Sequence, residues 1–512
     1  MRRLILTIVT ALSLTACMMG PDYKRPDMPA AEAWRLSPAT SESIANLAWW
    51  ELLRDSALQG LIRTALVENL DLRVAVATIE QYQAQLTITR FDLAPSVTAI
   101  GTGAYSHSTS NVIGIPAGAG AVSIPSGIRS GATDFASEFG GAGVKWELDV
   151  WGRIRRSIEA AHAQLLGQIE NQRAIVIGLV SNVAQAYFEL RALDLQIDIT
   201  KRTLKAWDES VRISRIRYQH GDIPKLDLNQ FEAERASTAA QLADIEQQVV
   251  QKENLLSVLL GRRPMSIPRG AGLTEQIMPP DVPPGLPSEL LRRRPDILMA
   301  EQEMASATAN IGVAQAQRFP AVSLTGNAGI SALHLTGLAG LGPFGAFGAL
   351  TSVSAPLFNA TALGYQVQAS EAKMRQARAA YQRTILSAFQ DVENALIAVQ
   401  KARDKRAAQE QQVEALQSAL GFASQRYQGG RASYLDVLTA QRNLFGAELA
   451  LADTRRAQLT STVQLYKALG GGWSPEERSG STPHTAQVTA GQSMPDRTPA
   501  EVKLMQQRAD NN

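Results

Sequence analysis

The sequence predicts a mainly helical chain that carries two pairs of membrane β-strands and is built as two copies of one unit. Three observations predict this fold: an internal repeat, short segments of alternating apolar and polar residues, and very long tracts without proline. Each copy reads as helix, strand, loop, strand, very long helix, turn and long helix.

Two hairpin turns show the repeat most clearly. RYQHGDIPKLDL, residues 217–228, recurs 209 residues later as RYQGGRASYLDV, residues 426–437, with Arg, Tyr, Gln, Gly, Leu and Asp at matching places. At a shift of 225, Asn69–Gly101 aligns with Arg294–Gly326. The chain therefore divides into a signal peptide (1–16), an N-terminal segment (17–48), a first repeat (49–261), a proline-rich connector (262–287), a second repeat (288–470) and a polar tail that we expect to be disordered (471–512).

The strands are identified by their period of two, and we expect them at about 95–105, 135–151, 320–330 and 345–358. Val144, Trp146 and Leu148 alternate with Lys145 and Glu147, as in a strand with a lipid-facing side and a wet side. A soluble sheet with one solvated face fits equally well. Membrane barrels need about eight strands and cannot leave open edges in lipid. If the four strands of this chain span a membrane, several chains must therefore share one barrel. The segments 106–133 and 332–343, between paired strands, are expected to be exposed loops.

The long helices are predicted from proline-free tracts in which apolar residues are spaced by threes and fours, a coiled-coil seam. At 1.5 Å per residue the longest would extend roughly 100 Å. Small residues beside the seam would admit a second neighbour, so such helices could form a ring. An isolated antiparallel coiled coil that serves as a stalk is the alternative. The expected helices are 153–219, 224–260, 362–428 and 433–469.

The N-terminus has the features of a bacterial lipoprotein signal. Its uncharged stretch, Leu4–Ala16, is too short to span a bilayer and ends in Leu-Thr-Ala-Cys, which resembles a lipobox. Cys17, the only cysteine, would then carry S-diacylglycerol and an N-acyl group such as palmitate, which anchor the chain. An ordinary signal peptide with an incidental cysteine is the alternative. Removal of two arginines takes the formal charge from +2 to 0, which gives no support for nucleic-acid binding.

These features together resemble the TolC family of outer-membrane efflux proteins, particularly its OprM-like, NodT-type lipoprotein branch. The most specific match is PPGLPSELLRRRPDILMAEQEMASATANIGVAQAQRFPAVSLTG, residues 283–326, and Gly20–Pro26 matches the usual start of the mature lipoproteins. The resemblance implies a homotrimer whose β-barrel, with four strands from each chain, continues into a periplasmic α-helical barrel. It also implies a passive outer-membrane exit duct for drugs or other small toxic compounds. A periplasmic adaptor and an inner-membrane transporter of the resistance-nodulation-division type would be its partners.

In that family the helix-helix turns lie at the periplasmic tip, where the channel closes and the adaptor docks. Ser433-Tyr434-Leu435-Asp436 also has the pattern of a capping box, which accounts for Asp436 structurally, whereas Pro224 prevents the same box in the first turn. By resemblance, the periplasmic aperture would be formed by Leu435, Asp436 and Thr439. The adaptor-docking turns would use Gly221, Asp222, Asp227, Gly429, Gly430, Arg431 and Ser433.

Two other classes of function are less consistent with the sequence. The five histidines are scattered, no catalytic, metal-binding or cofactor motif is present, and His220 is expected to be a solvated turn residue rather than a metal ligand. An enzyme is therefore not indicated. A lipid-anchored periplasmic coiled-coil scaffold would explain Cys17 and the long helices, but not the duplicated strand pairs whose polar faces share one phase.

Overall fold

The computed structural model describes residues 18–27, 34, 49–108, 133–277, 287–335 and 341–471. These residues belong to one compact unit that ends at Gly472. The predicted signal peptide, Cys17 and the residues beyond Gly471 lie outside the described residues. Among the described helices, none is long and apolar enough to span a membrane.

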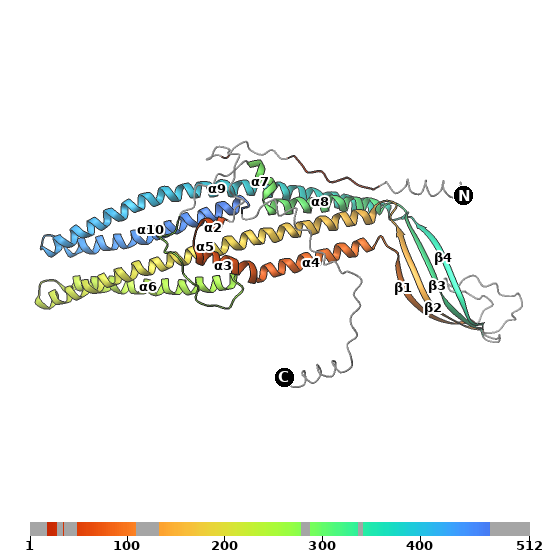
Figure 1. The fold of residues 1–512 in the computed structure, drawn as a ribbon, viewed down its shortest axis with the longest axis horizontal. Coiled ribbons are helices and arrows are strands. Elements are labelled where there is room, and N and C mark those ends of the chain that lie inside the picture. Colours follow the sequence, from red (N-terminus) through yellow and green to blue (C-terminus); the bar gives the residue numbers. More distant parts are fainter. Residues whose placement is uncertain are drawn as a thin grey trace, which may run out of the picture. The chain divides into compact units, whose positions relative to one another are not determined.

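The predicted fold class is confirmed: long helices dominate, and one four-stranded antiparallel sheet accompanies them (Figure 1). The strands are β1 (Ser96–Ser108), β2 (Thr133–Leu148), β3 (Ala321–Leu335) and β4 (Leu341–Ser354). The helices are α2 (Trp49–Leu52), α3 (Ser56–Glu68), α4 (Leu70–Phe91), α5 (Arg153–His220), α6 (Lys225–Leu259), α7 (Pro287–Arg293), α8 (Pro295–Ala316), α9 (Ala360–Gln428) and α10 (Tyr434–Ala468).

Strand ends differ most from the expected bounds. The strand predicted over 135–151 ends at Leu148, because the Asp149 carboxylate accepts the N–H groups of Ile154 (2.9 Å) and Arg155 (3.0 Å) and begins α5. The strand predicted over 345–358 ends at Ser354, since Pro356 has no N–H for a ladder. The loop predicted over 332–343 is shorter, because β3 and β4 extend into it.

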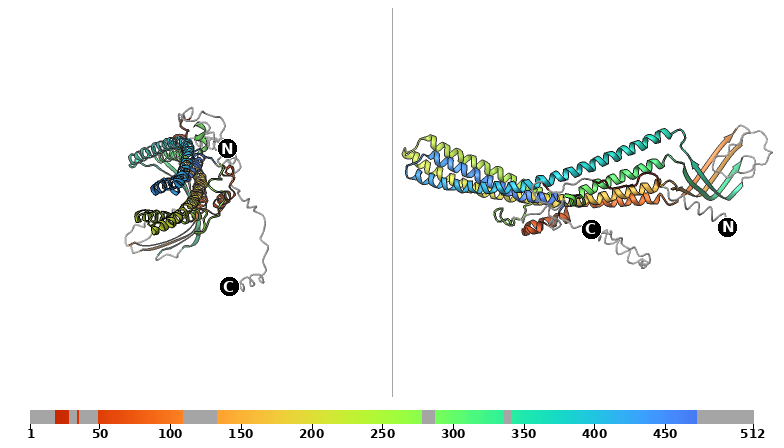
Figure 2. Two further views of the ribbon diagram at one scale, coloured as in Figure 1. Left: turned by 90° about the vertical axis from the view of Figure 1, so that its left-hand side faces the viewer. Right: turned by 90° about the horizontal axis from the view of Figure 1, so that it is seen from above.

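The sheet and the helices share one spatial order. Strands pair as β1-β2-β3-β4, and the helices joined to them pack in the same sequence, α4 on α5, α5 on α8 and α8 on α9 (Figure 1). Beyond the ends of α4 and α8, the return helices α6 and α10 take their places, with α6 on α5 and α10 between α5 and α9 (Figure 2). The chain thus forms four columns: β1-α4-α6, β2-α5, β3-α8-α10 and β4-α9.

Two junctions hold the stacked helices end to end. Asn69, at the start of α4, donates its Nδ2 to the carbonyl of Leu259 at the end of α6 (2.9 Å) and accepts from Leu72 N–H (3.0 Å). Arg294, at the equivalent place in the second repeat, donates Nη1 to the carbonyl of Ala468 at the end of α10 (3.1 Å). Each residue therefore satisfies a carbonyl that the C-terminus of the stacked return helix, α6 or α10, leaves unpaired.

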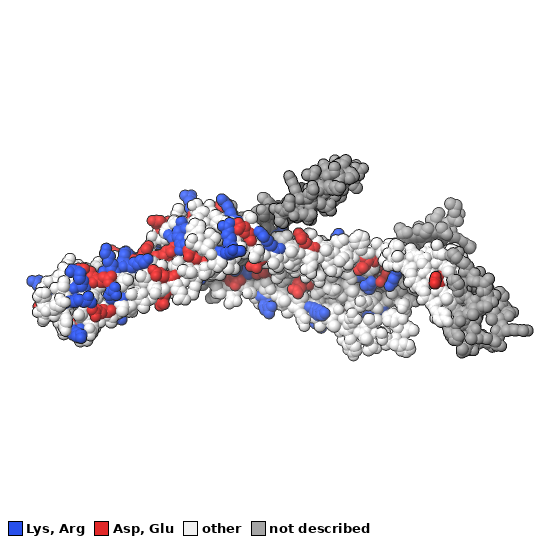
Figure 3. Space-filling view, turned by 90° about the horizontal axis from the view of Figure 1, so that it is seen from below, with Lys and Arg blue, Asp and Glu red and all other residues white. Residues whose placement is uncertain are grey.

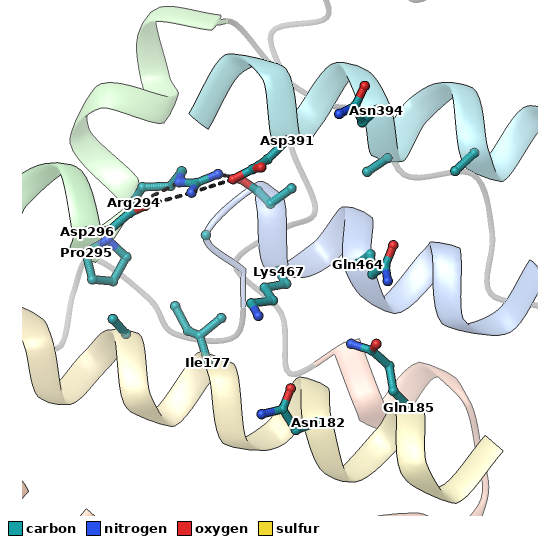
Figure 4. A pocket seen from close by; sticks show the side chains of 15 residues that line it. Ile177, Asn182, Gln185, Arg294, Pro295, Asp296, Asp391, Asn394, Gln464 and Lys467 are labelled. Atoms are coloured by element: carbon teal, nitrogen blue, oxygen red, sulfur yellow. Dashed lines mark hydrogen bonds and ion pairs between the residues drawn. The ribbon is translucent and has the colours of Figure 1, made fainter. Parts of the chain in front are cut away.

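Arg294 also forms ion pairs with Asp296 (2.7 Å) and Asp391 (2.9 Å), beside a hollow of about 610 Å³ (Figure 4). Burial opposes the charged guanidinium, but the two carboxylates outweigh it, so the pKa of Arg294 is raised. Asn182, Gln464 and Lys467 are among the polar side chains that line this hollow. The second junction is therefore the more strongly charged of the two.

The main core surrounds these junctions. Tyr187 of α5 is fully buried and donates its hydroxyl to the Asp55 carboxylate (2.8 Å), which also accepts from Gln276 Nε2 (2.7 Å). The other oxygen of Asp55 caps α3 by accepting from Ala57 N–H (2.9 Å). Trp49 stacks on Tyr466 with 5.5 Å between ring centroids. These contacts tie the short helices α2 and α3 to the long columns.

Candidate gating site at the hairpin turns

The two hairpin turns have the same backbone geometry. Gly221 and Gly430 both take positive φ, 81° and 68°, which side chains disfavour. Asp222 N–H donates to the carbonyl of Arg217 (2.9 Å), and Arg431 N–H donates to that of Arg426 (2.8 Å). Both long helices therefore end in a Schellman-type reversal, as the matching sequences predict.

The caps of the return helices differ, as predicted. Ser433 Oγ accepts from Leu435 N–H (3.2 Å), and the Asp436 carboxylate accepts from Ser433 N–H (3.1 Å), which completes the capping box. Pro224 caps α6 without any side-chain hydrogen bond. Asp436 is thus engaged locally by its own helix terminus, although its side chain is exposed.

The proposed aperture residues share one exposed face of α10. Leu435 is 50% exposed, Asp436 and Thr439 are also exposed, and the intervening Val437 and Leu438 are buried. Thr439 lies one turn beyond both Leu435 and Asp436, so the three exposed side chains are neighbours on the helix surface. Leu435 belongs to none of the apolar clusters of the described residues, so half of its surface is left for contact with another molecule.

Most of the expected docking residues are also exposed. They are Gly221, Asp222, Gly429, Gly430, Arg431 and Ser433. Asp227 is the exception, because only 7% of it is exposed. It lies near the hydroxyl of Tyr434, where its charge acts on that group, so it is not available as a docking contact in this structure. His220 is exposed, and its Nδ1 lies 2.8 Å from the carbonyl of Ile216.

A contact between the two hairpins centres on Tyr434. Its hydroxyl donates to Gln230 Oε1 of α6, and its ring packs edge-on against Phe231 with centroids 5.8 Å apart. Burial and the negative charge of Asp227 raise the pKa of Tyr434. The ring lies beside a small cluster formed by Trp207, Val211, Leu228, Phe231 and Leu438. We call this set of contacts the Tyr434 latch.

Electrostatic contacts also join the two hairpins on either side of the latch. The Arg217 guanidinium lies over the Tyr427 ring, 4.7 Å from its centroid, at the ends of α5 and α9. Arg442 of α10 pairs with Glu234 of α6 at 3.5 Å. On the face shown in Figure 3, charged side chains crowd the hairpin half and are sparse over the sheet. Exposed pairs of this kind contribute about 0.2–1 kcal/mol each.

Sequence reasoning missed the latch, because it assigned Tyr434 only to the capping sequence. Gln230 lies 204 residues away from Tyr434, and no local pattern joins them. The available signal was the apolar pair Leu228 and Phe231, spaced by three on the first return helix, opposite Trp207.

Comparison with known proteins identifies the family. The profile of the outer membrane efflux protein family matches residues 61–262 and 286–471, which correspond to the two repeats. This chain belongs to that family. It is 36% identical to the probable efflux pump outer membrane protein TtgC of Pseudomonas putida, over 92% of this chain and 96% of that protein. It is 32% identical to the cation efflux system protein CusC of Escherichia coli K12, over 91% and 99%.

The fold agrees with this family assignment. The outer-membrane channel OprN superposes with a TM-score of 0.78 at 28% identity, covering 89% of this chain and all of that chain. The protein is therefore an outer-membrane efflux channel with a periplasmic helical extension, as the sequence predicts. The alternative of a scaffold without channel activity is not supported. The hairpin turns are accordingly the end of that periplasmic extension furthest from the strands.

Proposed function

We propose that the protein is the passive, trimeric exit duct of a tripartite pump that expels small toxic compounds, and that it opens at the hairpin turns. The two open edges of its column arrangement support the trimer most directly. Columns β1-α4-α6 and β4-α9 each have a partner on one side only. Pairing β4 of one chain with β1 of the next would satisfy both edges and give a closed barrel of twelve strands.

The aperture assignment is supported by the exposed face of α10. In a trimer, three copies of Leu435, Asp436 and Thr439 would approach the axis, with apolar and acidic groups at successive levels. We call α9 and α10 the inner hairpin, and α5 and α6 the outer hairpin. The latch would hold the inner hairpin to the outer one in the closed state. Withdrawal of α10 from α6 would break the bond between Tyr434 and Gln230 and widen the aperture.

Docking of a periplasmic adaptor is assigned to the exposed turns, without Asp227. Asp222 of the first turn and Arg431 of the second occupy equivalent backbone positions but carry opposite charges. An adaptor could therefore distinguish the two turns by charge. Cross-linking from cysteines at 222 and 431 to an adaptor joined to a resistance-nodulation-division transporter should succeed, and failure at both positions would contradict this docking.

Lipid anchoring at Cys17 is supported by the segment that follows it. Met19 N–H donates to the carbonyl of Trp151 at the junction of strand and helix (3.1 Å). The buried Arg156 binds the carbonyls of Met19 (3.0 Å) and Gly20 (3.1 Å). Met19, two residues after Cys17, therefore lies beside the membrane strands, and a lipid on Cys17 would be within reach of the bilayer surface. Mass spectrometry of the mature N-terminus tests the acylation.

The names of relatives indicate the classes of compound to test as exported substrates. Relatives are named for the efflux of toluene, antibiotics and cations. A deletion strain, complemented by the wild-type chain, should be screened against dyes, detergents, antibiotics, solvents and metal salts. We expect deletion to sensitise the strain to one of these classes and complementation to restore resistance. Unchanged susceptibility to all of them would contradict the proposed export function.

A further inference from the structure

The strand register separates the sheet into two chemically different faces. Val97 lies opposite Val144, Leu148 opposite Val322, and Val322 opposite Val353, so the apolar residues of neighbouring strands share one face. The other face carries Ser96 opposite Lys145, and Lys145 opposite Thr325. We call these the apolar face and the polar face.

The polar face is the concave one. Gly141 and Gly329 are cross-strand partners on it, and a Cβ added to Gly141 would lie 2.3 Å from the carbonyl oxygen of Ala328. A Cβ added to Gly329 would lie 2.3 Å from the carbonyl oxygen of Gly140. Neighbouring backbones fold over this face so closely that only glycine fits, and the sheet is visibly curved (Figure 2). A barrel closed from such sheets must have its polar face inside.

Lys145 is the one charged side chain of this face without a partner among the described residues. It lies on β2, three residues before the strand ends at Leu148, and lines a hollow of about 430 Å³ together with Thr98, Thr325 and Asn327. Glu147, the next charged residue on the face, is paired with Arg153 at 2.9 Å. The described polar face therefore carries one uncompensated positive charge per chain.

We propose that Lys145 is a specificity-determining residue of the channel, and that its three copies form a positively charged ring inside the strand barrel that favours anionic over cationic solutes. This inference rests on the proposed trimer. A ring of charge in a water-filled pore raises the local concentration of oppositely charged solutes, and the effect weakens as salt is added. The permeants it favours are small anions and compounds with an exposed carboxylate, sulfonate or phosphate.

The field of Lys145 can be measured with a thiol at its cross-strand neighbour. Thr325→Cys is the probe, because Thr325 lies directly opposite Lys145 and the chain has no cysteine except Cys17. Intact cells are treated at low salt with membrane-impermeant thiosulfonates, one with a sulfonate and one with a quaternary ammonium group. These reagents enter from outside the cell, so the measurement does not depend on the periplasmic aperture. The wild-type chain gives the background labelling.

We expect the anionic reagent to react faster than the cationic one. At about 6 Å in water, one unit charge changes each rate about threefold in opposite directions, so K145Q should lower the ratio of the two rates about tenfold. K145E should lower it further, to favour the cationic reagent, and K145R should retain the wild-type ratio. Glu138→Gln, which removes a charge from the apolar face, is the matched control and should leave the ratio unchanged.

Each outcome bears on the inference differently. If Thr325→Cys is labelled but K145Q and K145E leave the ratio of the two labelling rates unchanged, Lys145 does not determine selectivity. That result would leave the proposed channel intact. Labelling of Glu138→Cys without labelling of Thr325→Cys would show that the polar face is not inside the barrel. Failure of both thiols to react in cells, although both react in denatured protein, would contradict the open trimeric duct itself.

Discussion

Replacing Tyr434 by phenylalanine is expected to open the channel. The substitution removes the hydroxyl that bonds to Gln230 but leaves the ring in place against Phe231. The packing of the hairpin ends should therefore persist, and only the polar part of the Tyr434 latch is lost. Because the hydroxyl joins α10 to α6, its loss should favour the state in which the two hairpins separate.

The magnitude follows from the number of bonds broken. One neutral hydrogen bond contributes about 1 kcal/mol, which is about a fivefold change in an equilibrium constant. If three chains open together, the effect multiplies to about a hundredfold in the open population. Tyr434→Ala would also remove the aromatic contact with Phe231, worth about 0.5–1.5 kcal/mol per chain, and should open the channel further.

Single-channel recording of the purified protein in planar bilayers measures this population directly. Tyr218→Phe is the matched control, since Tyr218 lies near the end of α5, is 40% exposed and has no recorded hydroxyl bond among the described residues. We expect the control to behave as wild type. If Tyr434→Phe pores stay as closed as the Tyr218→Phe pores, the hydroxyl does not hold the hairpins together and the latch is wrong.

Three further predictions separate other roles. Asp436→Asn should raise conductance if the carboxylate lines the aperture. Ser433→Ala weakens only the capping box, so it should cost about 1 kcal/mol of helix stability and leave conductance unchanged. Equal effects of the two substitutions on conductance would mean that Asp436 acts only as a capping residue. Arg294→Ala should lower the free energy of unfolding by about 1.5–3 kcal/mol in chemical denaturation, because the Ala468 carbonyl loses its donor and the carboxylates of Asp296 and Asp391 lose the charge that balances them. Arg431→Ala at the exposed turn should change it little. Burial, and then Asp55, raise the pKa of Tyr187, so its stabilising effect is complete below the unfolded value of about 10 and is lost as pH rises above it. The thermal midpoint of the wild type should therefore fall more steeply than that of Tyr187→Phe between about pH 9 and 11, and parallel curves would contradict this linkage.

The long elements were predictable because their signals are local. Absence of proline, apolar spacing and the cap residues fix where a helix can run, and the observed ends of α5 and α10 lie within about two residues of the expected ones. Strand ends were less certain, because they depend on competition between neighbours. Asp149 fits the polar-apolar alternation of β2, but its carboxylate instead accepts N–H groups at the start of α5. The alternation alone cannot show whether such a residue continues the strand or caps the helix.

Contacts between distant segments could not be predicted from one sequence. The repeat aligns Asn69 with Arg294, yet the chemistry at these positions differs, so the shared role emerges only when each side chain is seen beneath a helix end. Asp227 illustrates the opposite error. Its place beside a turn suggested exposure, but the fold buries it against the second hairpin.

The distribution of the core explains how the tip can open without unfolding the chain. The largest cluster of buried apolar side chains surrounds the junctions, where the short helices add Trp49, Leu58 and Ile62. At the tip, α10 contributes only Leu438 and the partly buried Tyr434 to the cluster shared with α5 and α6. Separating the hairpins there would expose these two side chains and the apolar side chains of α5 and α6 that they cover, and would break surface ion pairs of about 0.2–1 kcal/mol each. That cost is of the size a docking partner can supply, whereas separation at the junctions would expose a whole core. In the proposed opening, the junctions would therefore stay fixed and the inner hairpin would bend from them.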